Sequence, residues 1–204
     1  LLMAFVHLHN HTEYSLLDGA TKVYDMVKRA ADLGMPAVAI TDHGVMSGVP
    51  ELADACDKVK AETGTWVKPI FGCEIYFTTD SSLKKEGKQK LHHMILLAKN
   101  NTGYHNIVKL VSESHVDNFY FAAHDLEMLE KYSEGVIATS ACIAGIIPRC
   151  VDAGKIDEAI EWAKKLSALY EPGDFYIELQ DHGLEEDTIV LPQLIKLARE
   201  TGIP

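Results

Sequence analysis

The sequence predicts an α/β fold built on a parallel sheet, because strand-like and helix-like segments alternate along the chain. Residues 37–40 form a wholly apolar run, which is typical of a parallel strand that is covered on both faces. Residues 23–33 carry apolar side chains at helical spacing, and Gly34 and Pro36 end that expected helix. The same alternation continues downstream, so the sheet is either an open doubly wound sheet or a closed barrel.

The expected elements follow one another with mostly short connections. The expected strands are residues 6–11, 37–40, 67–76, 92–98, 135–142 and 175–180. The expected helices are residues 23–33, 48–60, 104–114, 126–132, 156–166 and 185–200. Residues 80–90 are polar and rich in lysine, which indicates an exposed loop. The segment Leu33-Gly34-Met35-Pro36 ends a helix with a Gly-x-Pro pattern and precedes a strand. The same pattern occurs in Thr201-Gly202-Ile203-Pro204, so we expect a further strand after Pro204.

The length and composition of the chain are those of an ordinary globular domain. The 204 residues suit one domain, with 47% hydrophobic and 24% charged residues and no apolar run as long as a membrane span. Four cysteines without CxxC spacing indicate reduced thiols in a cytoplasmic protein. The net charge of −11 argues against a broad DNA-coating surface, although it leaves room for a substrate phosphate that is held by cations.

Three histidines, His7, His9 and His11, occupy alternate positions in the first expected strand. Alternate side chains of a strand fall on one face, so the three imidazoles would point the same way while the apolar residues are buried on the other. Imidazoles held this close repel one another when protonated, and a metal ion is the usual agent that keeps them neutral. The alternatives are a strand whose histidines are only hydrogen-bonded, and a histidine tract of the kind found in tags.

Other polar side chains lie near the ends of later expected strands, where parallel α/β folds place their functional sites. Together with the first strand, the candidate metal ligands are His9, His11, Asp18, His43, Glu74, Cys142 and one histidine of the adjacent pair His92 and His93. Imidazole, carboxylate and thiolate groups suit Zn²⁺, Mn²⁺ or Fe²⁺, with Mg²⁺ as an alternative. Seven candidates are more than one tetrahedral ion needs, so we expect two or three ions.

The chemistry that this set favours is metal-assisted hydrolysis of a phosphoester. Two ions about 3.5–4 Å apart would polarise a phosphoryl oxygen and supply a hydroxide nucleophile near neutral pH. Glu74 offers two oxygens and is the natural bridge between ions, so Glu74, His9 and His11 are the candidate catalytic residues. The sequence contains no GxSxG elbow and no P-loop.

Several candidates have simpler explanations. Asp18 precedes a glycine, a pair that favours a turn, and Cys142 could be a plain buried side chain. Asp42 is more typical of a residue that orients a ligand or caps a helix than of a ligand itself. We expect His7 to support the ligands or pack, and His182 to touch substrate at the rim.

Several stretches resemble a known family. His9-Asn10-His11-Thr12, Ile40-Thr41-Asp42-His43-Gly44 and Gly72-Cys73-Glu74 resemble the first three motifs of the PHP (polymerase and histidinol phosphatase) domain. Longer sequence segments, including Glu13–Gly19, Leu96–Asn100 and Glu178–Gly183, are similar to the N-terminal PHP domains of bacterial replicative DNA polymerase III alpha subunits.

The resemblance implies a distorted, TIM-like, seven-stranded β/α barrel with three metal ions at its rim. His9 and His11 would hold one ion with Glu74, which would bridge to a second ion held by His93 and Cys142. Asp18 and His43 would belong to a third. The family's last motif, Asp-x-His, would lie beyond Pro204, so residues 1–204 are expected to be a single PHP domain that lacks its last strand and two ligands.

The resemblance also implies a function and partners. Family members with an intact site can act as 3′–5′ proofreading exonucleases, and this chain keeps both histidines of the first motif. The expected partners are a DNA 3′ end presented by the parent polymerase, the remaining polymerase domains and replisome subunits. The alternatives are an inactive module that supports the polymerase, and a stand-alone phosphatase for small molecules.

Overall fold

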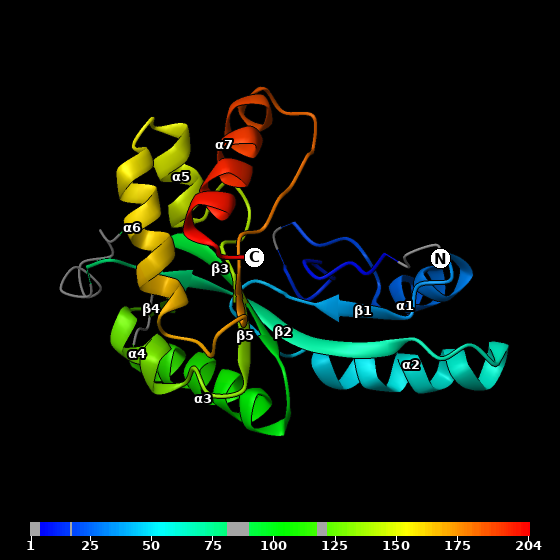
Figure 1. Ribbon diagram of the computed structural model, residues 1–204. Helices are drawn as coiled ribbons and strands as arrows, with labels where there is room; N and C mark the ends of the chain where they lie inside the picture. The colour runs from blue at the N-terminus through cyan, green and yellow to red at the C-terminus, as the bar shows by residue number, and fades with distance from the viewer. Residues whose placement is uncertain (1–4, 17, 81–89, 118–121) are drawn as a thin grey trace. The chain divides into compact units, whose positions relative to one another are not determined.

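The computed structural model describes residues 5–16, 18–80, 90–117 and 122–204. The chain divides into two compact units, Leu1–Glu74 and Ile75–Pro204. Strand β2 begins in the first unit and ends in the second (Figure 1). Residues 81–89, most of the expected lysine-rich loop, lie outside the described ranges.

The first unit is a β-α-β arrangement preceded by a helix. Its elements are α1 (Val23–Asp32), β1 (Ala37–Ile40), α2 (Val49–Thr63) and the start of β2 (Lys68–Phe77). β1 and β2 are parallel, with Ala37 opposite Lys68, and all four residues of β1 are buried, as the apolar run predicts. α1 packs against α2 and ends before Gly34, whose φ of +70° only glycine adopts without strain.

The second unit holds the remaining elements. They are β3 (His92–Ala98), α3 (Asn101–Asp117), β4 (Ala123–His124), α4 (Leu126–Lys131), β5 (Val136–Thr139), α5 (Ile146–Asp152), α6 (Ile156–Ser167), β6 (Phe175–Tyr176) and α7 (Glu185–Thr201). α3 packs on β3 and β5, while α5, α6 and α7 pack against one another (Figure 1). The sequence analysis did not predict β4, which has two residues, or α5.

The sheet is open and mixed in the described residues. Its strand order is β1-β2-β3-β5-β6, with β4 paired to β2, so these six strands do not close into the seven-stranded barrel that the resemblance implies. β5 and β6 are parallel, but β3 is antiparallel to β5, which corrects the expectation of an all-parallel sheet. Residues 78–91, which precede β3, lack an apolar repeat of helical spacing. Parallel neighbours need a crossover of the kind that such a repeat would provide.

The expected first strand, residues 6–11, is not a regular strand. Ala39 N donates to His7 O and Thr41 N donates to Asn10 O, so three residues along the first segment match two along β1. This is the irregularity of a bulge, and the Asn10 side chain fills it by donating to the carbonyl oxygens of His7 and Ala39. The predicted apolar face is also wrong, because Phe5 is 65% exposed and Leu8 is 43% exposed.

Candidate metal centre

Three predicted ligands of the first unit bring their polar atoms together. His9 Nε2 lies 2.6 Å from Glu74 Oε2, and His11 Nε2 lies 3.3 Å from His9 Nε2 and 3.5 Å from Glu74 Oε2. Ligand atoms about 2.1 Å from a tetrahedral ion are separated by about 3.4 Å. The two longer distances already match this spacing, so the donor set and its geometry fit a transition-metal ion.

A second group contains His43. Its Nδ1 atom lies 2.8 Å from Glu74 Oε1 and its Nε2 atom lies 2.9 Å from Asp18 Oδ2. Ligand atoms of His11, Asp18 and His43 all lie within 4.8 Å of one another, and the rings of His11 and His43 stack with centroids 4.1 Å apart. The two carboxylate oxygens of Glu74 therefore face different histidines.

The carboxylate of Glu74 is the electrostatic centre of this unit. It is fully buried, at 0% exposure, and a buried carboxylate requires compensating positive charge or hydrogen bonds. Its hydrogen bond to His43, its charge and the nearby Asp18 raise the pKa of His43 above the ordinary value, against the opposing effect of burial. A cation, whether a proton on an imidazole or a metal ion, is thus favoured beside Glu74.

Backbone pairing explains why His43 and Glu74 meet. Glu74 N donates to Asp42 O and Gly44 N donates to Glu74 O, which extends the parallel β1–β2 pairing past the end of β1. Gly44 has a φ of +64°, so the chain turns away immediately after this pairing. The sequence places Glu74 in a strand, but only this extended pairing brings it opposite His43.

Asp42 bonds to the segment that carries His9 and His11, and its role in orienting ligands stays a prediction. It is 1% exposed and accepts hydrogen bonds from Thr12 N, Thr12 Oγ1 and Ser15 Oγ. Because the Ser15 hydroxyl gives its proton to Asp42, its oxygen accepts from His11 Nδ1, 3.1 Å away. A neutral His11 then carries its proton on Nδ1 and leaves the Nε2 lone pair for a ligand bond.

His7 does not join the other histidines. Its side chain is exposed, and its ring meets the edge of Phe5 at a centroid distance of 4.8 Å. It lines a separate pocket with residues of α1, including Asp25 and Arg29. The bulge after His7 breaks the alternation that would have placed the three imidazoles on one face.

The predicted ligands of the second unit also form a pair. Cys142 Sγ lies 3.5 Å from His93 Nδ1. The bridge between His93 and Gly145, with His93 N donating to Ala144 O, holds the loop after β5 against the start of β3. Ala141 in this loop has a φ of +58°, which is strained for a residue other than glycine. Strain of this kind is often found at functional loops.

His92 and His93 have different surroundings, as adjacent residues of a strand should. His93 is half-buried, whereas His92 is 5% exposed. Burial, with help from the positive charges of Arg149 and Lys90, lowers the pKa of His92 to about 4, so this ring is neutral. Cys142 lies beside His93, the histidine of this pair that the family resemblance favours as a ligand.

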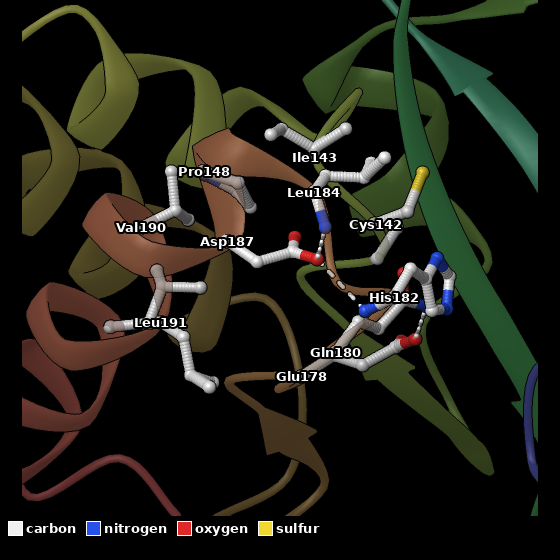
Figure 2. A pocket seen from close by; sticks show the side chains of 12 residues that line it. Cys142, Ile143, Pro148, Glu178, Gln180, His182, Leu184, Asp187, Val190 and Leu191 are labelled. Carbon is white, nitrogen blue, oxygen red and sulfur yellow. Dashed lines mark hydrogen bonds between the residues drawn. The ribbon is translucent and has the colours of Figure 1, made fainter.

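His182 and Cys142 line one pocket of about 280 Å³. Figure 2 shows both on one side of it, with Val190 and Leu191 of α7 on the other. Asp187 holds the loop in place by accepting from the backbone N–H groups of His182 and Leu184, and these bonds lower its pKa. The sequence analysis missed the remaining polar residues of the lining, Glu178, Gln180 and Asp187.

The comparisons with known proteins agree with the motifs. A model of the PHP domain matches residues 7–182, and the chain belongs to the PHP domain family. It is 44% identical over 208 residues to the DNA polymerase III subunit alpha of Borreliella burgdorferi, and 40% identical over 206 residues to that of Treponema pallidum. These alignments cover 98% and 99% of this chain but 17% of each relative.

Two solved structures show weaker likeness. One is described as a putative metal-dependent phosphoesterase from Bifidobacterium adolescentis, with 19% identity and a TM-score of 0.37. The other is described as an amidohydrolase from Chromobacterium violaceum, with 14% identity and a TM-score of 0.38. Each comparison covers 98% of this chain and 51% of the other. These likenesses are too weak to carry a functional inference.

Proposed function

We propose that this chain is the PHP domain of a bacterial replicative DNA polymerase alpha subunit and that it carries a metal-dependent phosphoesterase site. The observation that supports the proposal most directly is the convergence of His9 Nε2, His11 Nε2 and a buried Glu74 oxygen. The contacts at 2.6 and 3.3 Å are also within hydrogen-bond distance. Three potential ligand atoms that converge on one point nevertheless form the kind of donor set that a transition-metal ion needs.

In this proposal the chain would hold divalent transition-metal ions through three sets of residues. His9, His11 and Glu74 would bind one ion, and Asp18 and His43 would bind another. His93 and Cys142 would contribute to a further ion from the second unit. Zn²⁺, Mn²⁺ or Fe²⁺ suits these ligands, with Mg²⁺ as an alternative. Bound ions of this kind polarise phosphoryl oxygens and activate water.

The residues around the ligands would orient them for this chemistry. Asp42 and Ser15 would fix the ring of His11, so that its Nε2 atom faces Glu74. His182 would contact the substrate from the pocket that it lines with Cys142. His7, which lies apart from Glu74, has no part in this proposal.

The proposed reaction is removal of nucleotides from a DNA 3′ end, as in 3′–5′ proofreading. The chain spans 17% of the two polymerase subunits, so the polymerase reaction and the contacts with other replisome subunits would belong to the remaining length. With a net charge of −11, the chain needs those parts to present DNA. None of the helices in the described part of the chain has the length and apolarity of a membrane span. We propose a cytoplasmic location.

The proposed domain boundary has support in the backbone. Ile177 N, just after β6, donates to Pro204 O at 2.8 Å, as it would to a strand alongside β6. We propose that a further strand begins at Ile203 and adds to the sheet there. Closure into a seven-stranded barrel would require this strand.

The decisive experiment measures degradation of single-stranded DNA from its 3′ end by the full-length polymerase that contains this sequence. Mn²⁺ or Zn²⁺ is supplied, and His9→Ala and Glu74→Ala are compared with native protein and with His105→Ala, an exposed histidine of α3. We expect each ligand variant to lose activity by about 100-fold or more and His105→Ala to lose none.

Three other outcomes would replace the proposal. Equal rates in all four proteins would assign the nuclease to another part of the polymerase. Metal binding without any nuclease activity would favour a structural module. Hydrolysis of small phosphomonoesters in place of DNA would favour a small-molecule phosphatase.

A further inference from the structure

A second polar pocket lies in the second unit, on the side of β3 where His92 points. It has a volume of about 210 Å³ and lies between the start of β3, α5 and α6. Its lining includes four charged residues, Lys90, Arg149, Lys155 and Glu158, together with His92 and Trp162. Neither His93 nor Cys142 lines it, so it is separate from that pair of candidate ligands.

The charge of this pocket is opposite to that of the chain. Three cationic side chains and one carboxylate line it, in a protein with a net charge of −11. Lys155 Nζ is 2.9 Å from Glu158 Oε2, which neutralises one of the three. Lys90 has no ion pair in the described part of the chain. Arg149 donates to the carbonyl of Leu91 at 2.6 Å and has no acidic partner there. Glu158 also interacts electrostatically with Lys90, but it is one carboxylate among three cations, so the pocket keeps an excess of positive charge.

A buried polar atom of the same pocket also lacks a partner. His92 is 5% exposed, and its Nδ1 atom has no hydrogen-bond partner within the described ranges. Buried ring nitrogens are nearly always hydrogen-bonded, so an unsatisfied one in a native fold calls for a partner, and a bound group in the cavity would supply one. This observation does not depend on the excess of cationic side chains, and both concern the same cavity.

Size and charge together select the occupant. Pockets that enclose drug-sized ligands have volumes of about 300–1,000 Å³, so this one suits a small group. Guanidinium and ammonium groups are the usual partners of phosphate oxygens. A phosphate group can also accept a hydrogen bond from a ring nitrogen, or donate one to it when it is protonated.

We propose that this pocket binds a phosphate group, with Arg149 and Lys90 as the main cationic contacts and with the buried His92 ring as a hydrogen-bonding partner. The phosphate could belong to a free ion or to the backbone of a DNA strand, and the chemistry of recognition is shared. The inference goes beyond the proposed function and does not depend on it, because no candidate metal ligand lines the pocket.

The test measures binding to the 204-residue chain in a phosphate-free buffer that contains a chelator, so that metal-bound phosphate cannot contribute. The probes are inorganic phosphate and the dinucleotide d(TpT), which carries one backbone phosphodiester. Calorimetry gives the affinity, and Trp162 fluorescence in a Trp66→Phe background reports on the pocket itself, since Trp162 lines it. We expect saturable binding that weakens as salt is added.

The variants identify the contacts. Arg149→Gln should weaken binding by about tenfold, and Lys90→Gln by a smaller factor because that side chain is exposed. Lys164→Gln removes an exposed charge from α6 outside the pocket and should leave the affinity unchanged. Lys90→Gln also covers the case in which loss of the Arg149–Leu91 bond disturbs folding.

Each outcome decides the proposal. Binding of phosphate alone supports a site for the free ion, and binding of both probes supports a contact with the DNA backbone. Absence of saturation, or equal affinities in the native, Lys90→Gln and Lys164→Gln proteins, overturns the proposal. Loss of phosphate binding in Glu74→Gln would place the ligand at the metal centre and would also overturn it. Failure of the nuclease assay would leave this test unaffected.

Discussion

Replacing Glu74 by glutamine is the sharpest test of the metal centre in the first unit. The substitution keeps the shape of a fully buried side chain and removes its negative charge. In the native protein Oε2 lies 2.6 Å from His9 Nε2, and Oε1 lies 2.8 Å from His43 Nδ1. A glutamine can still accept one hydrogen bond at that position, but it can no longer balance the charge of a divalent cation.

The size of the effect follows from binding linkage. A ligand that binds only the folded state at about 100 times its Kd adds about 2.7 kcal/mol to the free energy of unfolding. For a chain of this length, about 2.7 kcal/mol corresponds to a rise in Tm of about 5–11 °C. We expect this rise when Zn²⁺ or Mn²⁺ is added to the native chain, and most of it should be absent in Glu74→Gln.

The assay is thermal unfolding followed by circular dichroism, with chelator and with metal, supported by calorimetric titration of the metal. Glu113→Gln is the matched control, since Glu113 is a partly exposed carboxylate on α3 that bonds to Lys131 and Tyr132. The control should keep the full metal-induced rise. An equal rise in Glu74→Gln and native protein would refute the assignment of Glu74 as a ligand.

Further predictions concern single side chains. Ser15→Ala removes the hydroxyl that accepts from His11 Nδ1, so metal affinity measured by calorimetry should fall by about 10–100-fold. The affinity should not change in Ser133→Ala, which removes the hydroxyl of a half-buried serine that donates to Glu130 O. Alkylation at pH 8 should label half-buried Cys142 first and slow down when metal is added, because Cys56, Cys73 and Cys150 are buried and burial raises the pKa of Cys56 to about 11. Labelling of Cys142 at the same rate with and without metal would contradict its role. Gly103→Ala should lower the free energy of unfolding by about 1–3 kcal/mol, because its Cβ would lie 1.7 Å from Gly135 O. Gly34→Ala should lower the free energy of unfolding by about 1–2 kcal/mol, because its φ of +70° is strained for alanine although the added Cβ meets no atom within 4 Å. Urea unfolding of both variants would test these two values.

Local patterns were sufficient for most helices and for the buried strands. The apolar run at residues 37–40 became β1 with the predicted bounds, and residues 92–98 became β3 with the predicted bounds. The apolar repeat at residues 23–33 became α1. These predictions succeed because periodicity and glycine or proline punctuation act within one element and do not depend on partners.

The arrangement of the strands was not available from such patterns. Strand direction depends on the connection and on pairing across the sheet, so β3 was expected to be parallel and is antiparallel to β5. The irregular segment from His7 to Asn10 shows the same limit. Its alternating histidines suggest a strand, but the backbone forms a bulge that the side chain of Asn10 fills by bonding to His7 O and Ala39 O.

The sequence by itself determined the kinds of groups in the candidate site and the family to which the chain belongs. Both follow from the residues of short motifs and from side-chain chemistry, which do not depend on how distant segments pack. Only the tertiary structure decided which groups meet. Glu74 reaches His43 because parallel pairing continues past β1, and His7 is excluded because a bulge intervenes. Both outcomes come from hydrogen bonds between segments about 30 residues apart, which no periodicity within either segment encodes.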